Sequence, residues 1–183
     1  MISLTRPKVI QLMLQICSAT SADLPEIAVM LDAGFGPARR NRTAYRLRDG
    51  VFPLPALSFI ARDGKALVGS LQCWPVQLRG LVGAPQPLVL LGPVVTATDR
   101  QGEGIATRMI NTALAAVDAS GVPPLMLIGN ASFYGRFGFS AVATVDWQLP
   151  GPVDRARFLL RGDASGLPGV GWVEPRGIVR RAA

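Results

Sequence analysis

Apolar residues recur with the period of an α-helix between Ile105 and Gly121. Ile105, Met109, Ala113 and Val117 are spaced by four residues, and further apolar side chains broaden the same face. Gly121 supplies a C-terminal stop, and two prolines follow shortly after it. The pattern therefore predicts an amphipathic helix with one buried face.

A continuous apolar run over residues 88–95 precedes this helix. Such a run is typical of a strand buried on both faces, because a half-exposed strand alternates apolar and polar residues. Gly92 and Pro93 interrupt the run, and proline cannot donate a ladder hydrogen bond, so we expect a bulge at this point. Two further strands are expected at 125–129 and 157–161.

The remaining patterns continue this alternation of strands and helices. We expect a strand at 11–17, helices at 20–34 and 37–48, a hairpin with arms at 57–62 and 66–78 around Asp63-Gly64, a loop at 80–87, a helical turn at 130–138 and a strand at 140–149. No repeat or second domain is evident. One α/β (α+β) domain is therefore expected over residues 1–183, with 1–8 as a loose arm and 162–183 as an irregular tail.

Charge changes the list of expected partners. The formal net charge is +7, and nearly all basic residues are arginines. This balance favours anionic partners, such as nucleic acid, acidic lipid or a polyphosphorylated cofactor, unless it reflects only a compositional bias. The chain contains no signature of the common nucleic-acid-binding folds and no apolar stretch that would span a bilayer, so we expect neither nucleic acid nor a membrane as partner.

The chain contains no histidine and two cysteines, Cys17 and Cys73. The absence of histidine excludes Ser-His-Asp and Cys-His catalysis and any His-ligated metal, and we expect no metal site. The cysteines form no C-x-x-C pair, so we expect them to be reduced core residues of a cytoplasmic protein.

A glycine-bearing turn, Gln101-Gly102-Glu103-Gly104-Ile105-Ala106, joins the buried strand to the helix. A strand, such a turn and a helix N-terminus together point free backbone N–H groups at a phosphate. No Lys-Ser/Thr pair follows Gly104, which excludes a P-loop, and no third glycine completes a dinucleotide fingerprint. The six residues fit a third pattern, Q/R-x-x-G-x-G/A.

With this pattern the chain resembles the GNAT superfamily of acyl-CoA-dependent N-acetyltransferases, in which the glycine turn binds a pyrophosphate. Tyr134-Gly135-Arg136-Phe137-Gly138-Phe139 is similar to the family's Y-x-x-x-G-F, and the hairpin at 60–69 is similar to a hairpin of the family. The resemblance covers approximately residues 11–149, and Leu149-Pro150-Gly151-Pro152 is like one poorly characterised bacterial subgroup.

The resemblance implies a mixed, mostly antiparallel sheet that is splayed at a bulged central strand, with flanking helices. It implies acetyl-CoA as the acyl donor and a primary amine as the acceptor, with no metal. The cofactor-binding residues would be Val94, Val95 and Thr96 for the pantetheine arm, Gln101, Gly102, Glu103, Gly104, Ile105, Ala106 and Thr107 for the pyrophosphate, and Asn130. A backbone N–H near Val94 would stabilise the oxyanion. Tyr134 would be the catalytic acid for the departing thiolate in a direct transfer.

Two departures from the family pattern leave alternatives open. Many members carry a glutamate base on the fourth strand, whereas residues 88–95 contain no ionisable group. A non-catalytic acyl-CoA-binding sensor is therefore the alternative function. Asn130 lies only four residues before Tyr134, where many members have a longer spacing, so no catalytic role is transferred to it.

The sequence allows two roles for several arginine side chains. Arg136 either reaches a cofactor phosphate or caps the short helix. The arginines from Arg39 to Arg48 either gate an anionic substrate or form a solvated helix face, and we favour the solvated face. We expect the Glu103 side chain to point to solvent. The acceptor and the oligomeric state, including a homodimer, stay open.

Overall fold

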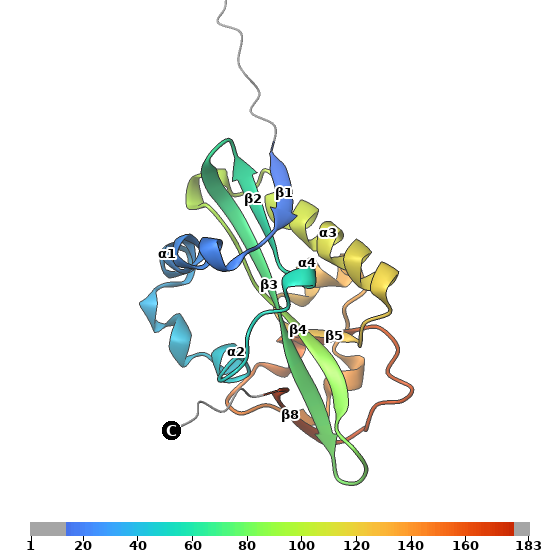
Figure 1. Cartoon of the computed structure of the whole chain (residues 1–183). Helices are drawn as coiled ribbons and strands as arrows, with labels where there is room; N and C mark the ends of the chain where they lie inside the picture. The colour runs from blue at the N-terminus through green and yellow to red at the C-terminus, as the bar shows by residue number, and fades with distance from the viewer. Residues whose placement is uncertain (1–13, 178–183) are drawn as a thin grey trace, which may run out of the picture.

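The computed structural model describes residues 14–177, which form a mixed sheet with helices on both faces (Figure 1). The strands are β1 (Gln15–Ser18), β2 (Phe59–Asp63), β3 (Ala66–Gly80), β4 (Gln86–Thr96), β5 (Leu125–Ile128), β6 (Trp147–Gln148), β7 (Phe158–Arg161) and β8 (Gly171–Pro175). The α-helices are α1 (Leu24–Phe35), α2 (Thr43–Arg46), α3 (Ile105–Ser120) and α4 (Ala131–Tyr134). The predicted arm at 1–8 and the start of the strand predicted at 11–17 lie outside the described residues.

The sheet has the order β1-β2-β3-β4-β5-β7, and β8 pairs with both β3 and β6. Neighbouring strands are antiparallel except for β4–β5 and β6–β8, which are parallel. A mostly antiparallel sheet with flanking helices confirms the predicted fold class. Within residues 14–177, no helix is both long and apolar enough to cross a membrane.

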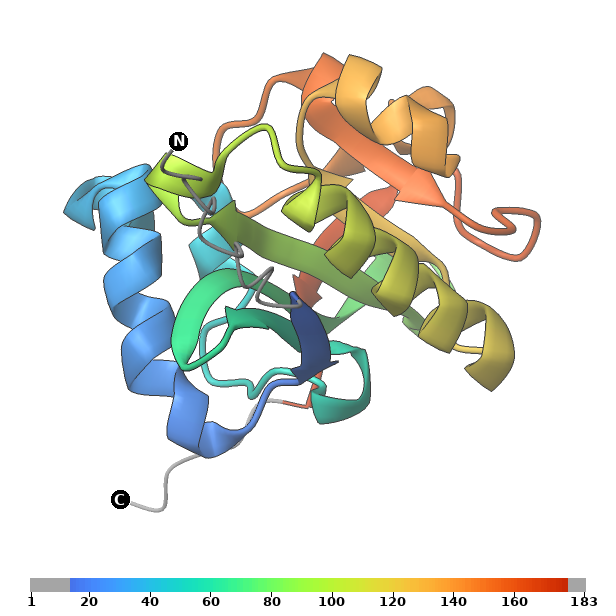
Figure 2. The ribbon, with the colours of Figure 1, turned by 90° about the horizontal axis from the view of Figure 1, so that it is seen from above.

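The two longest helices cover opposite faces of the sheet (Figure 2). Side chains along β2 alternate accordingly, because successive residues of a strand point to opposite faces. Phe59 and Ala61 pack in the core beneath α3, whereas Ile60 packs with Ile27 and Leu31 of α1. Each helix is thus anchored on the sheet by its own apolar cluster.

The α3 helix matches its prediction. Its apolar face, spaced by four residues from Ile105, is buried, and Gly121 ends the helix in the left-handed conformation with φ of 59°. Gly69 of β3 lets the helix approach the sheet closely, since a Cβ there would lie 2.8 Å from the end of the Met109 side chain. This contact fixes the N-terminal half of α3 against β3.

The sheet opens between β4 and β5, as predicted. Between Leu91 and Val94, two residues of β4 oppose a single residue of β3, which is the bulge expected at Gly92-Pro93. The parallel ladder between β4 and β5 contains only two residue pairs and ends at Leu90. Beyond Leu90 the two strands are unpaired with each other, and their edges border an opening.

The second helix predicted at 37–48 is divided in the structure. A 3-10 turn, Pro37–Asn41, is followed by Arg42 in an extended conformation and then by α2. The guanidinium of Arg39 explains the difference, because it turns inward to Asp32 and to the hydroxyl of Tyr45 instead of lying on a regular helix surface.

The C-terminal third departs most from the predictions. A strand over 140–149 is wrong, since only a bridge at Ser140 and the short β6 pair there. The Thr144 hydroxyl donates to the carbonyl of Phe158 at 2.6 Å. This hydrogen bond turns the chain inward between the bridge at Ser140 and β6. The irregular tail predicted at 162–183 is also wrong in part, because it contains β8, which extends the sheet beside β3.

The two cysteines are free. Cys73 is a fully buried core residue, as predicted, and burial raises the pKa of its thiol to about 12. Cys17 is exposed, so the prediction of a core residue is wrong there. Its strand, β1, is the edge strand of the sheet formed by residues 14–177.

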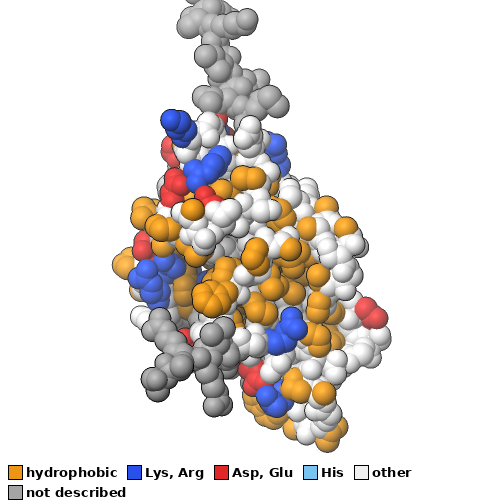
Figure 3. Space-filling view, viewed as in Figure 1, with side chains coloured by type: hydrophobic (Ala, Val, Ile, Leu, Met, Phe, Trp, Pro, Cys, Tyr) orange, Lys and Arg blue, Asp and Glu red, His pale blue; other side chains and the backbone are white. Residues whose placement is uncertain are grey.

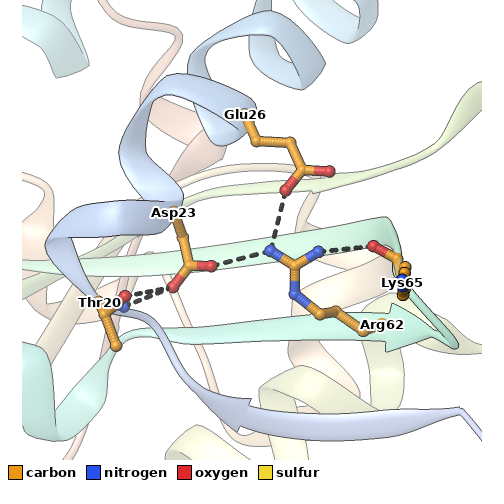
Figure 4. Close-up of polar contacts among 5 residues, drawn as sticks. All are labelled: Thr20, Asp23, Glu26, Arg62 and Lys65. Carbon is orange, nitrogen blue, oxygen red and sulfur yellow. Dashed lines mark hydrogen bonds and ion pairs between the residues drawn. The ribbon is translucent and has the colours of Figure 1, made fainter.

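Charged side chains fasten the start of α1 to the β2–β3 hairpin (Figure 4). Asp23 accepts hydrogen bonds from the backbone N–H and the hydroxyl of Thr20, at 2.8 and 2.7 Å, and these contacts belong to a capping box at the start of the helical segment. Arg62 joins Asp23 at 2.8 Å, Glu26 at 2.9 Å and the carbonyl of Lys65. Hydrogen bonds from Thr20, followed by those from Arg62, hold the pKa of Asp23 below its ordinary value.

Candidate active site

The predicted phosphate turn lies at the N-terminus of α3. Gly102 and Gly104 have φ of 87° and 76°, a conformation that favours glycine. Among the described residues, no atom beyond their chain neighbours would lie within 4 Å of a Cβ at either position, so both glycines border open space. The first N–H groups of the 16-residue helix therefore face an accessible turn, where the helix dipole favours an anion.

The other predicted residues of the turn differ in burial. Gln101 is exposed, Ala106 and Thr107 are half-buried, and Ile105 is buried in the core at 2% exposure. The Ile105 side chain therefore cannot contact a ligand. Its contribution to a phosphate site would come from the backbone.

Charged side chains beside the turn are paired with one another. The Nε of Arg100 donates to both carboxylate oxygens of Glu103, at 2.7 and 2.9 Å, and its Nη1 pairs with Asp63 at 2.8 Å. The hydrogen bond from Arg100 lowers the pKa of Glu103. Glu103 is exposed, as predicted, and its charge is matched by Arg100. An anion that binds at the turn would therefore meet mainly backbone N–H groups.

The predicted pantetheine contacts form the end of β4. Val94, Val95 and Thr96 pair with β3 along one edge of the strand. Their other edge has no ladder to β5, and of the three residues Val94 alone lines the cavity described below. Val95 is 5% exposed and packs towards α1, which leaves its main chain as the part that a ligand would meet.

Tyr134 follows β5 on the short α4, and its ring packs directly on Gly129. A Cβ at Gly129 would lie 2.4 Å from Cε2 of Tyr134, so no larger residue fits beneath the ring. Phe133 and Phe139 meet the same ring edge-on, with centroids 4.9 and 5.9 Å away. Burial raises the pKa of the Tyr134 hydroxyl to about 12, while nearby Arg157 acts in the opposite direction. Tyr134 therefore keeps its proton through the neutral pH range.

Asn130 caps the helix that carries Tyr134. Its side-chain oxygen accepts hydrogen bonds from the Ser132 hydroxyl at 2.6 Å and from the Phe133 N–H at 3.1 Å. Asn130 and Tyr134 also line the same cavity. Asn130 thus orients the tyrosine segment and borders the space in which the tyrosine lies.

Arg136 connects the two sequence motifs in space. Its guanidinium donates to the hydroxyl of Thr107, in the first turn of α3, at 3.0 Å. It also lies over the ring of Phe133, 4.2 Å from the centroid. Arg136 thus bridges α3 and the tyrosine segment instead of capping its own short helix.

A cavity of about 600 Å³ lies where β4 and β5 separate. One wall consists of residues 90–94 of β4, residues 127–130 at the end of β5, and Tyr134. The other lining residues come from the end of α1, from the chain that follows it through α2 to Arg48, and from residues 152–154 and 157. A cavity of this size accommodates a small ligand, and its two walls come from distant parts of the chain.

The wall beside α2 carries nearly all of the charge, and Figure 3 shows positive side chains gathered over the segment between α1 and α2. The charged residues that line the cavity are Arg39, Arg42, Arg48, Arg157 and Asp154. Arg39 is only 4% exposed and pairs with Asp32 at 2.7 Å. Burial lowers the pKa of Arg48 to about 10, and Tyr45 acts in the opposite direction. The predicted solvated helix face is therefore wrong for Arg39 and Arg48.

Asp154 and Arg157 are site residues that sequence reasoning missed. Asp154 is the cavity's one carboxylate among the described residues, and it caps a 3-10 turn by accepting the Ala156 N–H at 3.0 Å. The carbonyl of Arg157 accepts the N–H of Gly129 at 2.8 Å, which joins this turn to the end of β5. The capping pattern predicts a turn at most, because no spacing in the sequence relates it to β5. Across residues 14–177, no cluster of three Cys, Asp or Glu side chains could hold a metal ion.

Comparison with known proteins identifies relatives of this chain. The sequence model of the family described as acetyltransferase (GNAT) domain matches residues 15–142. The uncharacterized N-acetyltransferase YjhQ of Escherichia coli is 28% identical over 123 residues, which are 67% of this chain and 67% of YjhQ. The uncharacterized N-acetyltransferase YhbS of Escherichia coli is 24% identical over 139 residues, 74% of this chain and 79% of YhbS.

Solved structures share the fold. The GNAT family N-acetyltransferase YhbS from Escherichia coli, in complex with CoA, has a TM-score of 0.71 at 23% identity and covers 99% of this chain and 98% of its own. A GNAT family acetyltransferase from Brucella melitensis, in complex with acetyl-CoA, has a TM-score of 0.65 at 25% identity, with 92% and 99% covered. The family match, the splayed sheet and the glycine turn agree: this chain belongs to the GNAT family of acetyltransferases.

Proposed function

We propose that this protein transfers an acetyl group from acetyl-CoA to a primary amine by direct attack of the amine on the thioester. The observation that carries the proposal is the opening between β4 and β5, which is lined by Val94 from the unpaired end of β4 and by Tyr134. The accessible turn at Gly102 and Gly104 follows β4 along the chain. The complexes of two relatives with CoA and acetyl-CoA support the donor.

Backbone groups would provide most of the donor site. The N–H groups from Gln101 to Thr107 would bind the pyrophosphate, and the free edge of Val94, Val95 and Thr96 would bind the pantetheine amides. In this arrangement the thioester enters the cavity beside Asn130 and Tyr134. Arg136 would hold the two ends of this path together through its hydrogen bond to Thr107.

The attacking amine must lose its proton, since a free lysine-like amine has a pKa of about 10.4. Asp154 is the carboxylate in the cavity, and we assign it as the group that accepts this proton, directly or through water. The cationic side chains of the same wall lower the pKa of a bound amine, because like charges disfavour the protonated form. Both effects favour the neutral amine, so that no glutamate base on β4 is needed.

The tetrahedral intermediate and the departing thiolate need hydrogen-bond donors. We assign the oxyanion to a backbone N–H near Val94, at the bulge. Tyr134 donates to the leaving sulfur. Because its pKa is about 12 and an ordinary thiol has a pKa of about 8.5, complete proton transfer from Tyr134 is uphill. We therefore assign Tyr134 as the hydrogen-bond donor that stabilises the thiolate until solvent protonates it.

The direct test is CoA release from acetyl-CoA with a panel of primary amines, for the wild type and Tyr134→Phe. We expect turnover by the wild type and a kcat about 10- to 100-fold lower in the variant, with the KM for acetyl-CoA unchanged. Equal turnover in the two proteins would remove Tyr134 from the reaction. Tight acetyl-CoA binding without turnover on any amine would contradict the transferase and favour the acyl-CoA sensor.

A further inference from the structure

We infer that the acceptor amine carries a carboxylate group, and that Arg48 binds this carboxylate. The inference deepens the proposed function and rests on it, because it names the substrate class of the same cavity. It follows from three properties of the wall beside α2: an excess of positive charge, a half-buried arginine without an acidic partner, and buried N–H donors without acceptors.

The excess of charge belongs to the cavity itself. Four arginines line it against one acid, Asp154. Arg39 is neutralised by Asp32, but in the range 14–177 no acidic side chain forms an ion pair with Arg48 or Arg157. A cavity with this balance attracts an anion and disfavours a ligand whose only charges are positive.

Arg48 is held in place without being neutralised. Its guanidinium lies over the ring of Tyr45, 4.3 Å from the centroid, and over the ring of Trp74 at 5.6 Å. The Tyr45 side chain also stabilises the charge through its hydroxyl, but neither aromatic residue supplies a carboxylate that would neutralise Arg48. Its lowered pKa shows that burial of the charge is incompletely compensated.

Two buried N–H donors, one on Arg48 itself and one on Trp74, also indicate a site for an acceptor group. A hollow of about 370 Å³ adjoins the main cavity, and Arg39, Tyr45 and Arg48 line both. Trp74 lines this second hollow, and the Nε of Arg48 and the Nε1 of Trp74 are buried without hydrogen-bond partners in the described structure. Unpaired buried donors are rare, so each is expected to meet an acceptor when the site is filled. A carboxylate is the common acceptor-only group, and a guanidinium matches its geometry.

Arg39 lines the same cavity, but its hydrogen-bond donors are already occupied by protein groups. Its Nε donates to Asp32 at 2.7 Å, and its Nη1 donates to the hydroxyl of Tyr45. Arg39 therefore has a structural role that occupies its donors, although it lines the same cavity as Arg48. This difference between the two arginines leaves the Arg48 guanidinium available to a ligand.

The inference makes amino acids and related amino-carboxylates the expected acceptors. It disfavours polyamines and aminoglycosides, whose several positive charges would meet Arg48 and Arg157. In a bound amino acid, Asp154 would face the ammonium and Arg48 the carboxylate, so both charges of the substrate would find an opposite charge in the cavity.

Calorimetric titration of the CoA-bound protein tests this directly. Glycine, β-alanine, phenylalanine and glutamate are titrated as free acids and as their primary amides, with spermidine and kanamycin as polycations. Binding is measured before turnover, because the amides are less basic amines and would react faster for an unrelated reason. We expect at least one acid to bind about 10- to 100-fold more tightly than its amide.

Variants assign the effect to Arg48. Arg48→Met should remove the preference for the acid and leave acetyl-CoA binding unchanged. Arg40→Met is the matched control, because Arg40 lies on the neighbouring turn, has a 60% exposed side chain and does not line the cavity. Arg48→Lys, which keeps the charge without Nε, should retain part of the preference.

The outcomes separate the inference from the proposed function. If no acid binds more tightly than its amide, or if a polycation binds most tightly, the inference is overturned even when acetyl-CoA binds normally. Loss of the preference in Arg40→Met as well would assign it to net charge and overturn the role of Arg48. Failure of the wild type to bind acetyl-CoA would instead contradict the proposed function.

Discussion

The donor side and the acceptor side of the cavity are built in opposite ways. The donor side consists of a glycine turn, a helix N-terminus and a strand edge, and its charged side chains, Arg100, Glu103 and Asp63, are paired with one another. The acceptor side consists of side chains from separate segments. Three of its four arginines, Arg42, Arg48 and Arg157, have no acidic partner among the described residues.

This difference bears on specificity. Backbone groups bind what acyl-CoA donors have in common, and they depend on chain geometry more than on side-chain identity. Unpaired side chains respond to the charge and shape of one ligand. Substitutions on the two sides should therefore change different constants: acetyl-CoA binding on the donor side, acceptor binding on the acceptor side.

The largest expected effect comes from the position where the two sides meet. In Gly129→Ala, the new Cβ would lie 2.4 Å from the Tyr134 ring and must displace it. We expect kcat to fall about 100-fold, because a donor moved by an ångström loses most of its effect. Acetyl-CoA binding should change little.

Gly135→Ala provides the matched control for this prediction. Among the described residues, nothing beyond its chain neighbours would lie within 4 Å of a Cβ at Gly135, so this variant should keep wild-type kcat. Thermal unfolding of both variants shows whether each is folded. Equal kcat in Gly129→Ala and Gly135→Ala would contradict the placement of Tyr134 in the reaction.

A smaller effect is expected where α1, which leads into the acceptor wall, is fastened to the sheet. Asp23→Asn should lower the free energy of unfolding at pH 7 by about 1 kcal/mol, since it removes the charge that Thr20 and Arg62 stabilise. The pKa of Asp23 is lowered in the folded state. Its contribution is therefore present above the unfolded pKa of about 3.9 and is lost as the pH falls through the lower folded pKa.

Urea unfolding of the wild type and Asp23→Asn at pH 7 and pH 3 measures this contribution. The difference between the two proteins should narrow at the lower pH, because Asp23 of the wild type is then largely protonated in the unfolded state and its ionisation contributes less to stability. A difference that stays constant between the two pH values would show that the charge of Asp23 is not its source.

The smallest expected effect concerns the paired charges of the donor side. Glu103→Gln removes an acid beside the phosphate turn and releases Arg100 from its hydrogen bonds at 2.7 and 2.9 Å. We expect acetyl-CoA to bind about twofold more tightly at low salt, with the gain lost at high salt. Asp99→Asn, with the same change of charge on the same loop, should give a smaller gain. Weaker binding by Glu103→Gln would show that the carboxylate itself supports the turn.

Sequence reasoning succeeded where structure depends on local pattern. The bulge at Gly92-Pro93, the left-handed Gly121 and the buried face of α3 all follow from the properties of neighbouring residues. The proposed donor side consists of such local features: the turn at Gly102 and Gly104 and the N-terminus of α3. The fold class follows from the same elements taken in order.

The acceptor side could not be predicted in this way. Arg48 and Arg157 meet at one cavity only because the chain folds, and arginine-rich spacing alone favours a solvated surface. The β8 strand was missed for a related reason: its five residues lie among glycines and prolines, and the pairing partner that stabilises it is β3, nearly a hundred residues earlier.

Calorimetric titration with acetyl-CoA is the direct test of whether the glycine turn at the start of α3 is the donor site. Gly104→Trp is compared with Gly121→Trp, because both positions have positive φ and open space but lie at opposite ends of α3. We predict micromolar binding of acetyl-CoA by the wild type and by Gly121→Trp, and an affinity at least about 100-fold lower in Gly104→Trp. Equal binding by the two variants, or no binding by the wild type, would contradict it.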